Sequence, residues 1–591
     1  MPHATLPSPG LQAFILCGPG VSLNTFTSNP RDLPKALIPI ANRPMVWYPL
    51  DWCYRMGVSD ITLITPYESA PALKAALSTH PALTSLPNPK AEILAPEELL
   101  QTTGTGELLR LGEVQRAITR DFVILPCDLV SEVEGSKVIQ QWMTLNPLFT
   151  KTDSSQRKGG LGVFYPTHGL ENISTKKDES DFLATVPLPS PSVPSPPGSL
   201  RADIEEIVTS MPTDTLNDKL EGDTGFLRLR QTLLSQHGRV KLRMRHRDAH
   251  VYVFPRWIKD FVVRNEKFDS VSEDVLGWWA KAGWQRCLTE KLGLDDVLGE
   301  KKAAYEDGIG DGAMADEDID PSALSSTRSG PSFRDPESPT PLFANRVGST
   351  APELGGKTPV TVPPLLAYIQ PPPSMSHTNQ PQPLIRRVDT AHQLAAISLY
   401  LARQSTFATT TAPPHPLAHE HKVHPTAFIG TQSRVSAEDC LIAENVKMGI
   451  RCNVKESVVG ANCEIGNNVR LTKCVLMDGV VVGDGVQMTG CIIGRRARVQ
   501  GMSPKPVSSA ADAGSEGAAE AEGGKAKRKK GGAAAPEDDE ERTRLTDCEV
   551  APNFVVEAGT EAKGEKLMAF DTEGAGEHDE EGEDMEDLDD I

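Results

Sequence analysis

The chain has 591 residues, a formal net charge of −20 and ten cysteines. This length is sufficient for two or three domains, each with its own hydrophobic core. The strong acidity disfavours a nucleic-acid-binding protein, and no stretch reaches the roughly 18–20 consecutive apolar residues that a membrane span requires. The N-terminus lacks the basic and apolar regions of a signal peptide, and the cysteines form no Cys-x-x-Cys pair, so we expect a cytosolic protein without a membrane anchor.

Phe14 to Cys17 is a short apolar run bounded by glycine, which predicts a buried parallel strand. Gly18 and Gly20 follow it and allow a sharp turn whose N–H groups can hold phosphates. Lys35 would bring a positive charge to the same phosphates. An ordinary tight turn is the alternative interpretation of these two glycines.

The next elements predict a Rossmann-like α/β unit. A strand, a helix and a second strand follow one another, and this order predicts a right-handed crossover in a parallel sheet. A Gly-rich turn containing Gly104 and Gly106 then leads into an amphipathic helix. The expected ranges are Met45 to Met56 for the first helix, Asp60 to Thr65 for the strand, Leu99 to Ile118 for the turn and its helix, and Asp121 to Leu125 for a further strand.

Asp128 follows this last strand directly. A carboxylate at the carboxyl end of a parallel strand lies where open α/β sheets bind their ligands. The alternative role is to cap the helix that follows. Both interpretations remain open from the residue spacing.

The second half of this unit contains a proline- and serine-rich segment near 187–198, which we expect to be disordered. Phe226 to Arg230 predicts the beginning of a helix. Helical periodicity returns between Val262 and Gly293, where three tryptophans lie close together. Such a cluster usually forms a core or a subunit contact rather than a cofactor site. The three residues are Trp278, Trp279 and Trp284.

Beyond the α/β unit the hydrophobic pattern changes period. From Ala427 onwards aliphatic residues recur near every sixth position, as at Ile465 and Leu471. Hexapeptide spacing is typical of a parallel β-helix. The expected organisation is an α/β domain at 11–300, a disordered linker at 301–364, a connecting strand and helix at 365–425, a β-helix at 426–500 and 545–560, a disordered insert at 501–544, and an acidic tail at 561–591.

The insert carries a basic run, Lys525 to Lys530. It could serve as a nuclear-localisation signal or a nucleic-acid patch. A solvated run inside a disordered loop explains it more simply.

Leu33-Pro-Lys-Ala-Leu-Ile-Pro-Ile-Ala-Asn-Arg-Pro44 resembles the second half of the signature of the sugar-1-phosphate nucleotidyltransferases. In that family Asp128 would match the aspartate that binds magnesium, and the turn at Gly104 and Gly106 would lie against base and sugar. The first half of the signature is incomplete, because no arginine follows Gly20 until Arg31.

His246 to Phe254 resembles the Asn-x-Gly-x-Tyr stretch with which these enzymes hold the sugar. Here Asp248 and His250 replace the asparagine and the glycine. The resemblance therefore implies a histidine ring in space that the enzymes keep for the sugar. His250 itself is expected to be a partly buried structural histidine.

A nucleotidyltransferase-like domain followed by a left-handed hexapeptide β-helix also resembles the gamma and epsilon subunits of the eukaryotic translation initiation factor 2B complex. The similarity is greatest to the gamma family, in Arg245 to Tyr252, Ala367 to Ile369 and Arg387 to Thr390. Because the chain ends in an acidic tail soon after the β-helix, we expect no epsilon-type exchange domain. The resemblance implies a non-catalytic subunit of the guanine-nucleotide exchange factor.

Such a subunit would pair with epsilon and the other subunits, act on initiation factor 2, and bind no nucleic acid directly. We expect no catalytic residues, no cofactor and no metal. Gly18, Gly20, Lys35, Gly104, Gly106, Asp128 and Asp248 are then candidates for a vestigial nucleotide pocket. On this interpretation Asp128→Ala leaves assembly and exchange nearly unchanged.

The alternative is an active sugar-1-phosphate nucleotidyltransferase similar to GDP-mannose pyrophosphorylase. It would use Lys35, Asp128 and magnesium to stabilise the phosphates. This alternative predicts an intact signature, which the chain lacks at two positions.

Overall fold

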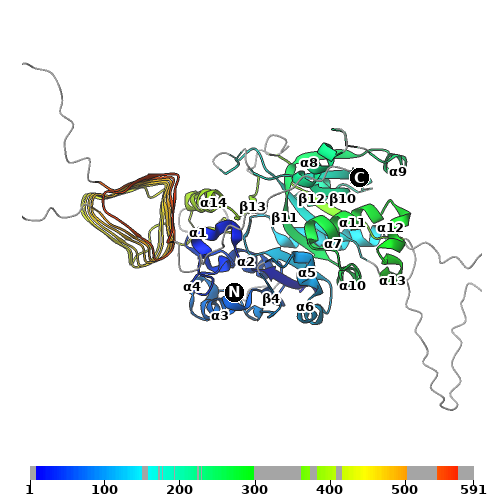
Figure 1. Ribbon diagram of the computed structural model, residues 1–591, viewed down its shortest axis with the longest axis horizontal. Coiled ribbons are helices and arrows are strands. Elements are labelled where there is room, and N and C mark those ends of the chain that lie inside the picture. Colours follow the sequence, from blue (N-terminus) through cyan, green and yellow to red (C-terminus); the bar gives the residue numbers. More distant parts are fainter. Residues whose placement is uncertain are drawn as a thin grey trace, which may run out of the picture.

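A computed structural model describes residues 8–100, 102–149, 158–170, 173–175, 178–191, 193–196, 198–222, 225–227, 229–298, 361–372, 382–406, 415–501 and 542–569. These residues form two parts that lie side by side along the long axis of the molecule (Figure 1). The first part is an α/β unit and the second is a stack of short strands. Helix α14 (Ala391–Arg403) lies between them.

The α/β unit is built on one nine-stranded sheet, in the order β5-β4-β1-β6-β11-β8-β12-β10-β9. Strands β4 and β6 pair with β1 in parallel, as the crossover rule predicts. Strand β11 is antiparallel to β6, so the sheet is mixed. The strands are β1 (Gln12–Leu16), β4 (Ile61–Ile64), β5 (Glu92–Leu94), β6 (Phe122–Pro126), β8 (Gly160–Pro166), β9 (Asp181–Pro187), β10 (Ile204–Pro212), β11 (Lys241–Phe254) and β12 (Leu365–Ile369).

Successive residues of β1 supply the cores on the two faces of the sheet. Ala13 and Ile15 pack in one cluster and Phe14 packs in the other, as strand alternation requires. The first face is covered by α2 (Trp47–Arg55), α3 (Ala70–Thr79), α4 (Pro81–Thr84), α7 (Gly135–Phe149) and α14. The second is covered by α5 (Thr105–Arg110), α6 (Gly112–Ala117), α10 (Trp257–Arg264), α11 (Leu276–Ala282), α12 (Arg286–Lys291) and α13 (Leu294–Leu298).

One sequence-based expectation within this unit is wrong in detail. The helix expected to begin within Phe226 to Arg230 begins instead at Gln231, as α9 (Gln231–Gln236). The segment near 187–198, predicted as disordered, has no helix or strand after Pro187 among its described residues, and Leu188 packs against the main core.

Strand β12 is not a connection between domains. It lies within the sheet, parallel to β8 and antiparallel to β10. All five of its residues are buried. The α/β unit therefore includes residues beyond the expected boundary at 300, because a buried apolar strand must complete its hydrogen bonds inside a sheet.

The chain then adds β13 (Ile385–Arg387), which pairs antiparallel with β7 (Leu129–Ser131) directly after β6. Thr390 caps the following helix α14, since its side chain accepts a hydrogen bond from the N–H of Gln393. This short sheet brings the segment after residue 382 to the carboxyl edge of the main sheet.

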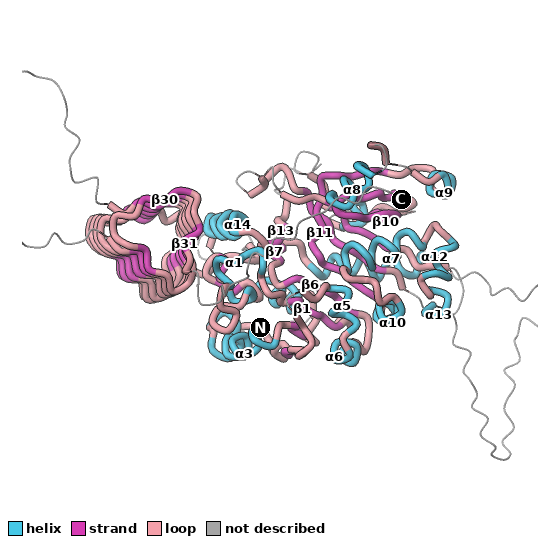
Figure 2. Tube along the Cα trace, in the orientation of Figure 1, coloured by secondary structure: helices cyan, strands magenta, loops and turns pink. Residues whose placement is uncertain are grey.

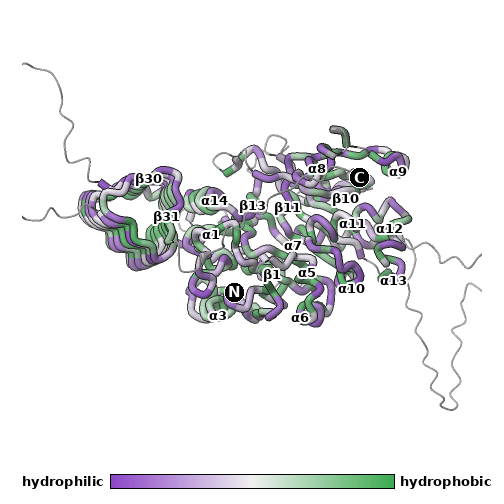
Figure 3. Tube along the Cα trace, in the orientation of Figure 1, coloured by the Kyte–Doolittle hydropathy of each residue, from purple (hydrophilic) through white to green (hydrophobic). Residues whose placement is uncertain are grey.

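The second part consists of three six-stranded sheets in which every pairing is parallel. Its short strands are separated by turns and stack coil upon coil, with hydrophobic residues recurring in each coil (Figures 2 and 3). The interior is filled by valine, isoleucine, leucine, methionine and cysteine side chains. This architecture fits the left-handed β-helix that the hexapeptide spacing predicts.

Each sheet takes one strand from every coil. The first contains β14 (Phe428–Ile429), β17 (Lys447–Met448), β20 (Glu464–Ile465), β23 (Val481–Val482), β26 (Arg498–Val499) and β29 (Val555–Val556). The second contains β15 (Arg434–Val435), β18 (Asn453–Lys455), β21 (Arg470–Thr472), β24 (Gln487–Thr489), β27 (Arg544–Thr546) and β30 (Glu561–Lys563). The third contains β16 (Leu441–Ile442), β19 (Val458–Val459), β22 (Val475–Leu476), β25 (Ile492–Ile493), β28 (Glu549–Val550) and β31 (Lys566–Leu567).

The stack continues in register across the insert, because β27 pairs with β24 and β28 with β25. The last coil extends to Leu567, so the expected boundary between β-helix and tail at 560 is wrong. Glu561 to Lys563 pair with β27, and these backbone bonds stabilise a coil whose sequence is largely charged. The rest of the predicted linker, insert and acidic tail, at 301–360, 502–541 and 570–591, lies outside the described residues.

The β-helix packs against the α/β unit through its third sheet. Outward-facing Leu441, Val458, Val475 and Ile492 belong to the same hydrophobic cluster as Leu394 of α14. Polar contacts also join the two parts, including a hydrogen bond of 2.8 Å from Oγ1 of Thr25 to Oε2 of Glu549. Among the helices of the described ranges, none is long and apolar enough to cross a membrane.

Candidate functional site

The turn after β1 contains the first two candidate glycines. Gly18 is exposed, and a Cβ built on it would meet nothing within 4 Å. Gly20 has φ +82°, and a Cβ there would lie 2.9 Å from Cγ2 of Thr27 and 3.0 Å from Cβ of Lys35. Gly20 therefore leaves the space through which the stem of Lys35 passes.

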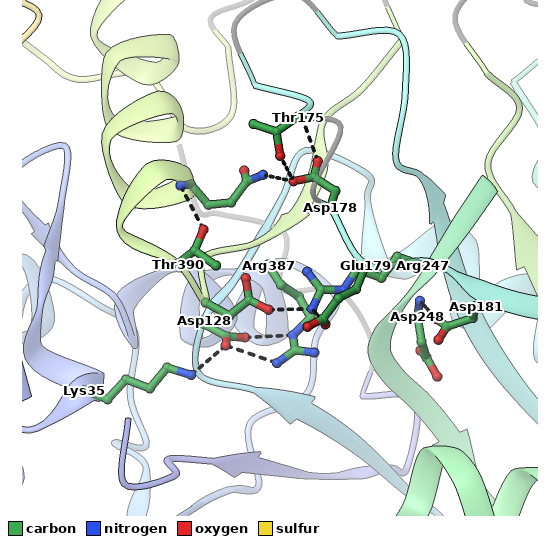
Figure 4. A network of polar contacts seen from close by, with 12 residues as sticks. Lys35, Asp128, Thr175, Asp178, Glu179, Asp181, Arg247, Asp248, Arg387 and Thr390 are labelled. Atoms are coloured by element: carbon green, nitrogen blue, oxygen red, sulfur yellow. Dashed lines mark hydrogen bonds and ion pairs between the residues drawn. The ribbon is translucent and has the colours of Figure 1, made fainter. Parts of the chain in front are cut away.

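Lys35, Asp128 and Arg387 form a cluster at the carboxyl edge of β6 (Figure 4). Nζ of Lys35 donates to Oδ2 of Asp128 at 2.7 Å. Arg387 at the end of β13 donates from Nε to Oδ1 and from a terminal nitrogen to Oδ2, both at 3.3 Å. The Asp128 side chain is 1 % exposed, and those of Lys35 and Arg387 are 11 % and 14 % exposed. We call this group the Asp128 cluster.

The two cations determine the charge of the carboxylate. Burial by itself raises the pKa of Asp128, but Arg387 and Lys35 outweigh it and hold that pKa well below its usual range. Burial lowers the pKa of Lys35, and the Asp128 carboxylate more than offsets this, so the pKa of Lys35 is raised. All three groups are therefore ionised near neutral pH.

A second ion pair lies beside the cluster. A terminal nitrogen of Arg247 lies 2.7 Å from Oε2 of Glu179 and 2.7 Å from Oδ2 of Asp389, two residues beyond Arg387 (Figure 4). The carboxyl edge of the sheet is thus held by alternating charges from β11 and from the segment around β13.

The candidate sugar-binding stretch lies in β11, where the pairing with β8 shifts between Asp248 and Tyr252. His250 in this bulge has φ +53°, the left-handed conformation that favours glycine. Oδ1 of Asp248 accepts from the His250 N–H at 2.8 Å, and Oδ2 accepts from the Tyr252 hydroxyl at 2.6 Å. The Asp248 carboxylate is therefore fully used within the bulge.

Burial is the largest cause of the pKa shifts of Asp248 and His250 in this bulge. Burial and the nearby Asp181 carboxylate raise the pKa of Asp248 to about 7. Burial, followed by the positive charge of Arg387, lowers the pKa of His250 well below its ordinary value. His250 is half-buried and neutral, and it lies near enough to Arg387 and Asp128 to experience their charges.

Gly104 and Gly106 do not join the Asp128 cluster and pack against Phe268 and Asp269. A Cβ on Gly104 would lie 2.2 Å from a side-chain oxygen of Asp269, and one on Gly106 would lie 2.7 Å from the backbone oxygen of Phe268. The N–H of Gly106 also donates to the Asp269 carbonyl at 2.7 Å. This turn is occupied by its own chain at the start of α5.

Arg31, the first arginine after Gly20, does not join the Asp128 cluster. It pairs with Glu68 at 3.5 Å, and the two side chains are 77 % and 53 % exposed. The arginine that reaches Asp128 is Arg387, which lies 259 residues further along the chain. Its motif was visible in the sequence as Arg387 to Thr390, but no local spacing links it to Asp128.

The Asp128 cluster does not fit a magnesium ion. Mg²⁺ requires octahedral oxygen ligands and usually binds through one or two carboxylates. Both oxygens of Asp128 contact cations, and both oxygens of Asp248 accept hydrogen bonds within the bulge. A metal ion at Asp128 would also face the charges of Lys35 and Arg387.

Comparisons with known proteins agree with this architecture. Residues 418–504 match the family model described as the EIF2B subunit epsilon LbH domain. The chain is also 27 % identical over 288 residues to "Translation initiation factor eIF2B subunit gamma" of Schizosaccharomyces pombe (strain 972 / ATCC 24843). That match covers 49 % of this chain and 55 % of the relative, so the chain spans about half the length of the curated relative. Together the two matches show that the chain is similar to eIF2B subunits, and they support an eIF2B gamma-like protein.

Proposed function

We propose that this chain is a non-catalytic subunit of an eIF2B guanine-nucleotide exchange complex in the cytosol. It pairs with an epsilon subunit and promotes the exchange of GDP for GTP on initiation factor 2. The similarity to the gamma subunit and the epsilon-type β-helix model supports membership of such a complex. The α/β unit and the β-helix then serve as a rigid body that presents surfaces to the other subunits.

The Asp128 cluster is the observation that carries the non-catalytic part of this proposal. A nucleotidyltransferase must keep its carboxylate free for a metal ion and its lysine free for phosphate. Here Lys35 and Arg387 neutralise Asp128, and all three side chains are buried. In this reading the cluster joins η2 (Lys35–Leu37), β6 and β13, and requires neither metal nor cofactor.

The experiment that tests this proposal measures release of labelled GDP from initiation factor 2. Three samples are compared: an epsilon subunit alone, this chain alone, and both together. We expect stimulation above the epsilon rate in the mixture and no release by this chain alone. Exchange by this chain alone, or no effect in the mixture, would contradict the assignment.

A parallel assay addresses the nucleotidyltransferase alternative directly. The full chain is incubated with GTP, a sugar 1-phosphate, Mg²⁺ and labelled pyrophosphate. We expect no exchange of label into GTP, because the Asp128 carboxylate is already neutralised. Magnesium-dependent exchange that Lys35→Met abolishes would make the chain an enzyme.

A further inference from the structure

A groove of about 520 Å³ is lined by elements that lie at the end of the molecule away from the β-helix, among them α8 (Thr213–Gly222), α9 and α12 (Figure 1). It is formed by β9, β10, α8, α9, α11 and α12. Its base consists of buried apolar side chains such as Phe182 and Trp284, which form a small core of their own. A groove of this size can accept one or two large side chains.

Large apolar side chains also line the rim of the groove, where they are open to solvent. Phe226 is 75 % exposed, Leu229 is 45 % exposed and Trp278 is 37 % exposed. The neighbouring Trp279 and Trp284 are buried and donate from their indole nitrogens to the carbonyls of Pro363 and Val208. Trp278 is thus the one member of the tryptophan cluster that the core does not use, and exposed aromatic side chains gathered on one surface mark an interaction site.

Four cations surround this apolar surface: Lys219, Arg230, Lys281 and Lys291. Among the residues that the structure describes, no carboxylate lines the groove and none of the four cations has a salt-bridge partner. Nζ of Lys281 lies 4.8 Å from the centre of the Trp278 ring. This arrangement is unusual in a chain with a net charge of −20.

The cations also lie close enough to repel one another. Burial lowers the pKa of Lys281, the charges of Lys219 and Arg230 lower it further, and the Asp274 carboxylate offsets only part of this. A bound anion would relieve this repulsion.

Another groove, beside α3 and β5, is lined by two lysines, Lys74 and Lys90. Its Lys90 donates to the carbonyls of Leu83, Thr84 and Leu86, so the ammonium is already bound by its own chain.

We propose that the groove of Phe226, Trp278 and Lys281 binds an acidic segment of a partner protein that carries aromatic or leucine side chains between its carboxylates. The apolar side chains enter the groove between α9 and α11. The carboxylates pair with the four cations on its rim. This inference does not depend on the proposed role in nucleotide exchange.

The test uses the full chain and a synthetic peptide of about 15 residues in which Asp and Glu alternate with Phe and Leu. Binding is measured by calorimetry at low and at high salt. We expect binding that weakens as salt screens the charges. A peptide with Ser in place of Phe and Leu, and one with Lys in place of Asp and Glu, should each bind at least about tenfold more weakly.

Cys287 locates the bound peptide, because it lines the groove and is the only exposed cysteine of the ten. The peptide should slow its reaction with a thiol reagent. Lys281→Glu and Phe226→Ser should each reduce the affinity at least tenfold. Matched controls outside the groove, Lys74→Glu and Leu100→Ser, should leave it unchanged.

Two results would overturn the proposal. One is equal binding of all three peptides, or binding that Lys281→Glu leaves unchanged. The other is a Cys287 thiol that does not react in the wild-type chain but reacts in a variant whose acidic residues within 306–320 are replaced by serine. In that case the occupant is a segment of the chain itself and not a partner.

Discussion

Replacing Asp128 by asparagine tests whether the Asp128 cluster holds the α/β unit together. The change removes one negative charge and nearly preserves the shape of the side chain. Lys35 then remains at 11 % exposure without the carboxylate it pairs with, and Arg387, at 14 % exposure, keeps only the charge of the neighbouring Asp389. Removing one partner of a buried ion pair destabilises proteins by about 3–5 kcal/mol, whereas exposed pairs contribute about 0–1 kcal/mol.

The assay is urea unfolding of the full chain followed by circular dichroism. Asp128→Asn should lower the unfolding midpoint by the equivalent of about 3–5 kcal/mol. Glu68→Gln is the matched control, because it breaks the exposed pair with Arg31 and should change stability by less than about 1 kcal/mol.

The contribution of Asp128 to the free energy of unfolding decreases at acidic pH. Since the folded pKa of Asp128 is depressed, its stabilisation is fully present above the unfolded value of about 3.9 and is lost as the pH falls below it. The Asp128→Asn effect should therefore be constant between about pH 5 and pH 8. An Asp128→Asn protein as stable as wild type, alongside a normal Glu68→Gln control, would refute the structural role of the cluster.

Three further outcomes are expected. Trp279→Ala should destabilise the chain by about 3–5 kcal/mol in thermal unfolding, whereas Trp278→Ala should have an effect of less than about 1 kcal/mol, and equal effects would contradict the packing. Burial lowers the pKa of His246 to about 4, so the free energy of unfolding should rise by about 3 kcal/mol as the pH increases from about 4 to 6.5. His246→Asn should flatten this slope, and an unchanged slope would refute the lowered pKa of His246. Replacing 502–541 by a short glycine turn should leave the melting temperature nearly unchanged, because Thr543 donates to the Gln500 carbonyl at 2.7 Å across the insert, and a β-helix that fails to fold would contradict this.

The elements with local signals could be predicted from the sequence. The six-residue step of aliphatic side chains defines the β-helix, because each coil buries the same positions against the coil before it. The last coil was missed since Glu561, Lys563 and Lys566 lie on its surface and only Ala562 and Leu567 point inward. Its strands are specified by backbone pairing to the coil beneath, which leaves little trace in the sequence.

The candidate site was predictable only in part. Lys35 and Asp128 were identified from a motif and from a position after a strand, and the structure brings them together. The role of Arg387 and the place of β12 in the sheet depend on contacts between distant segments. The interpretation of the pocket as vestigial predicts that Asp128→Ala leaves assembly nearly unchanged. Asp128 is the centre of a buried ion cluster, so we now expect Asp128→Ala to impair folding.

The most direct test of the central claim replaces the whole cluster by apolar residues. A Lys35→Met, Asp128→Val, Arg387→Met chain removes all three charges, and such replacements of buried ion clusters are often neutral or stabilising. The measurement is GDP release from initiation factor 2 by this chain together with an epsilon subunit. We expect stimulation equal to that of the wild-type chain. A variant that folds and binds the epsilon subunit but no longer stimulates release would show that the pocket acts in exchange itself, and would contradict the purely structural role of the cluster.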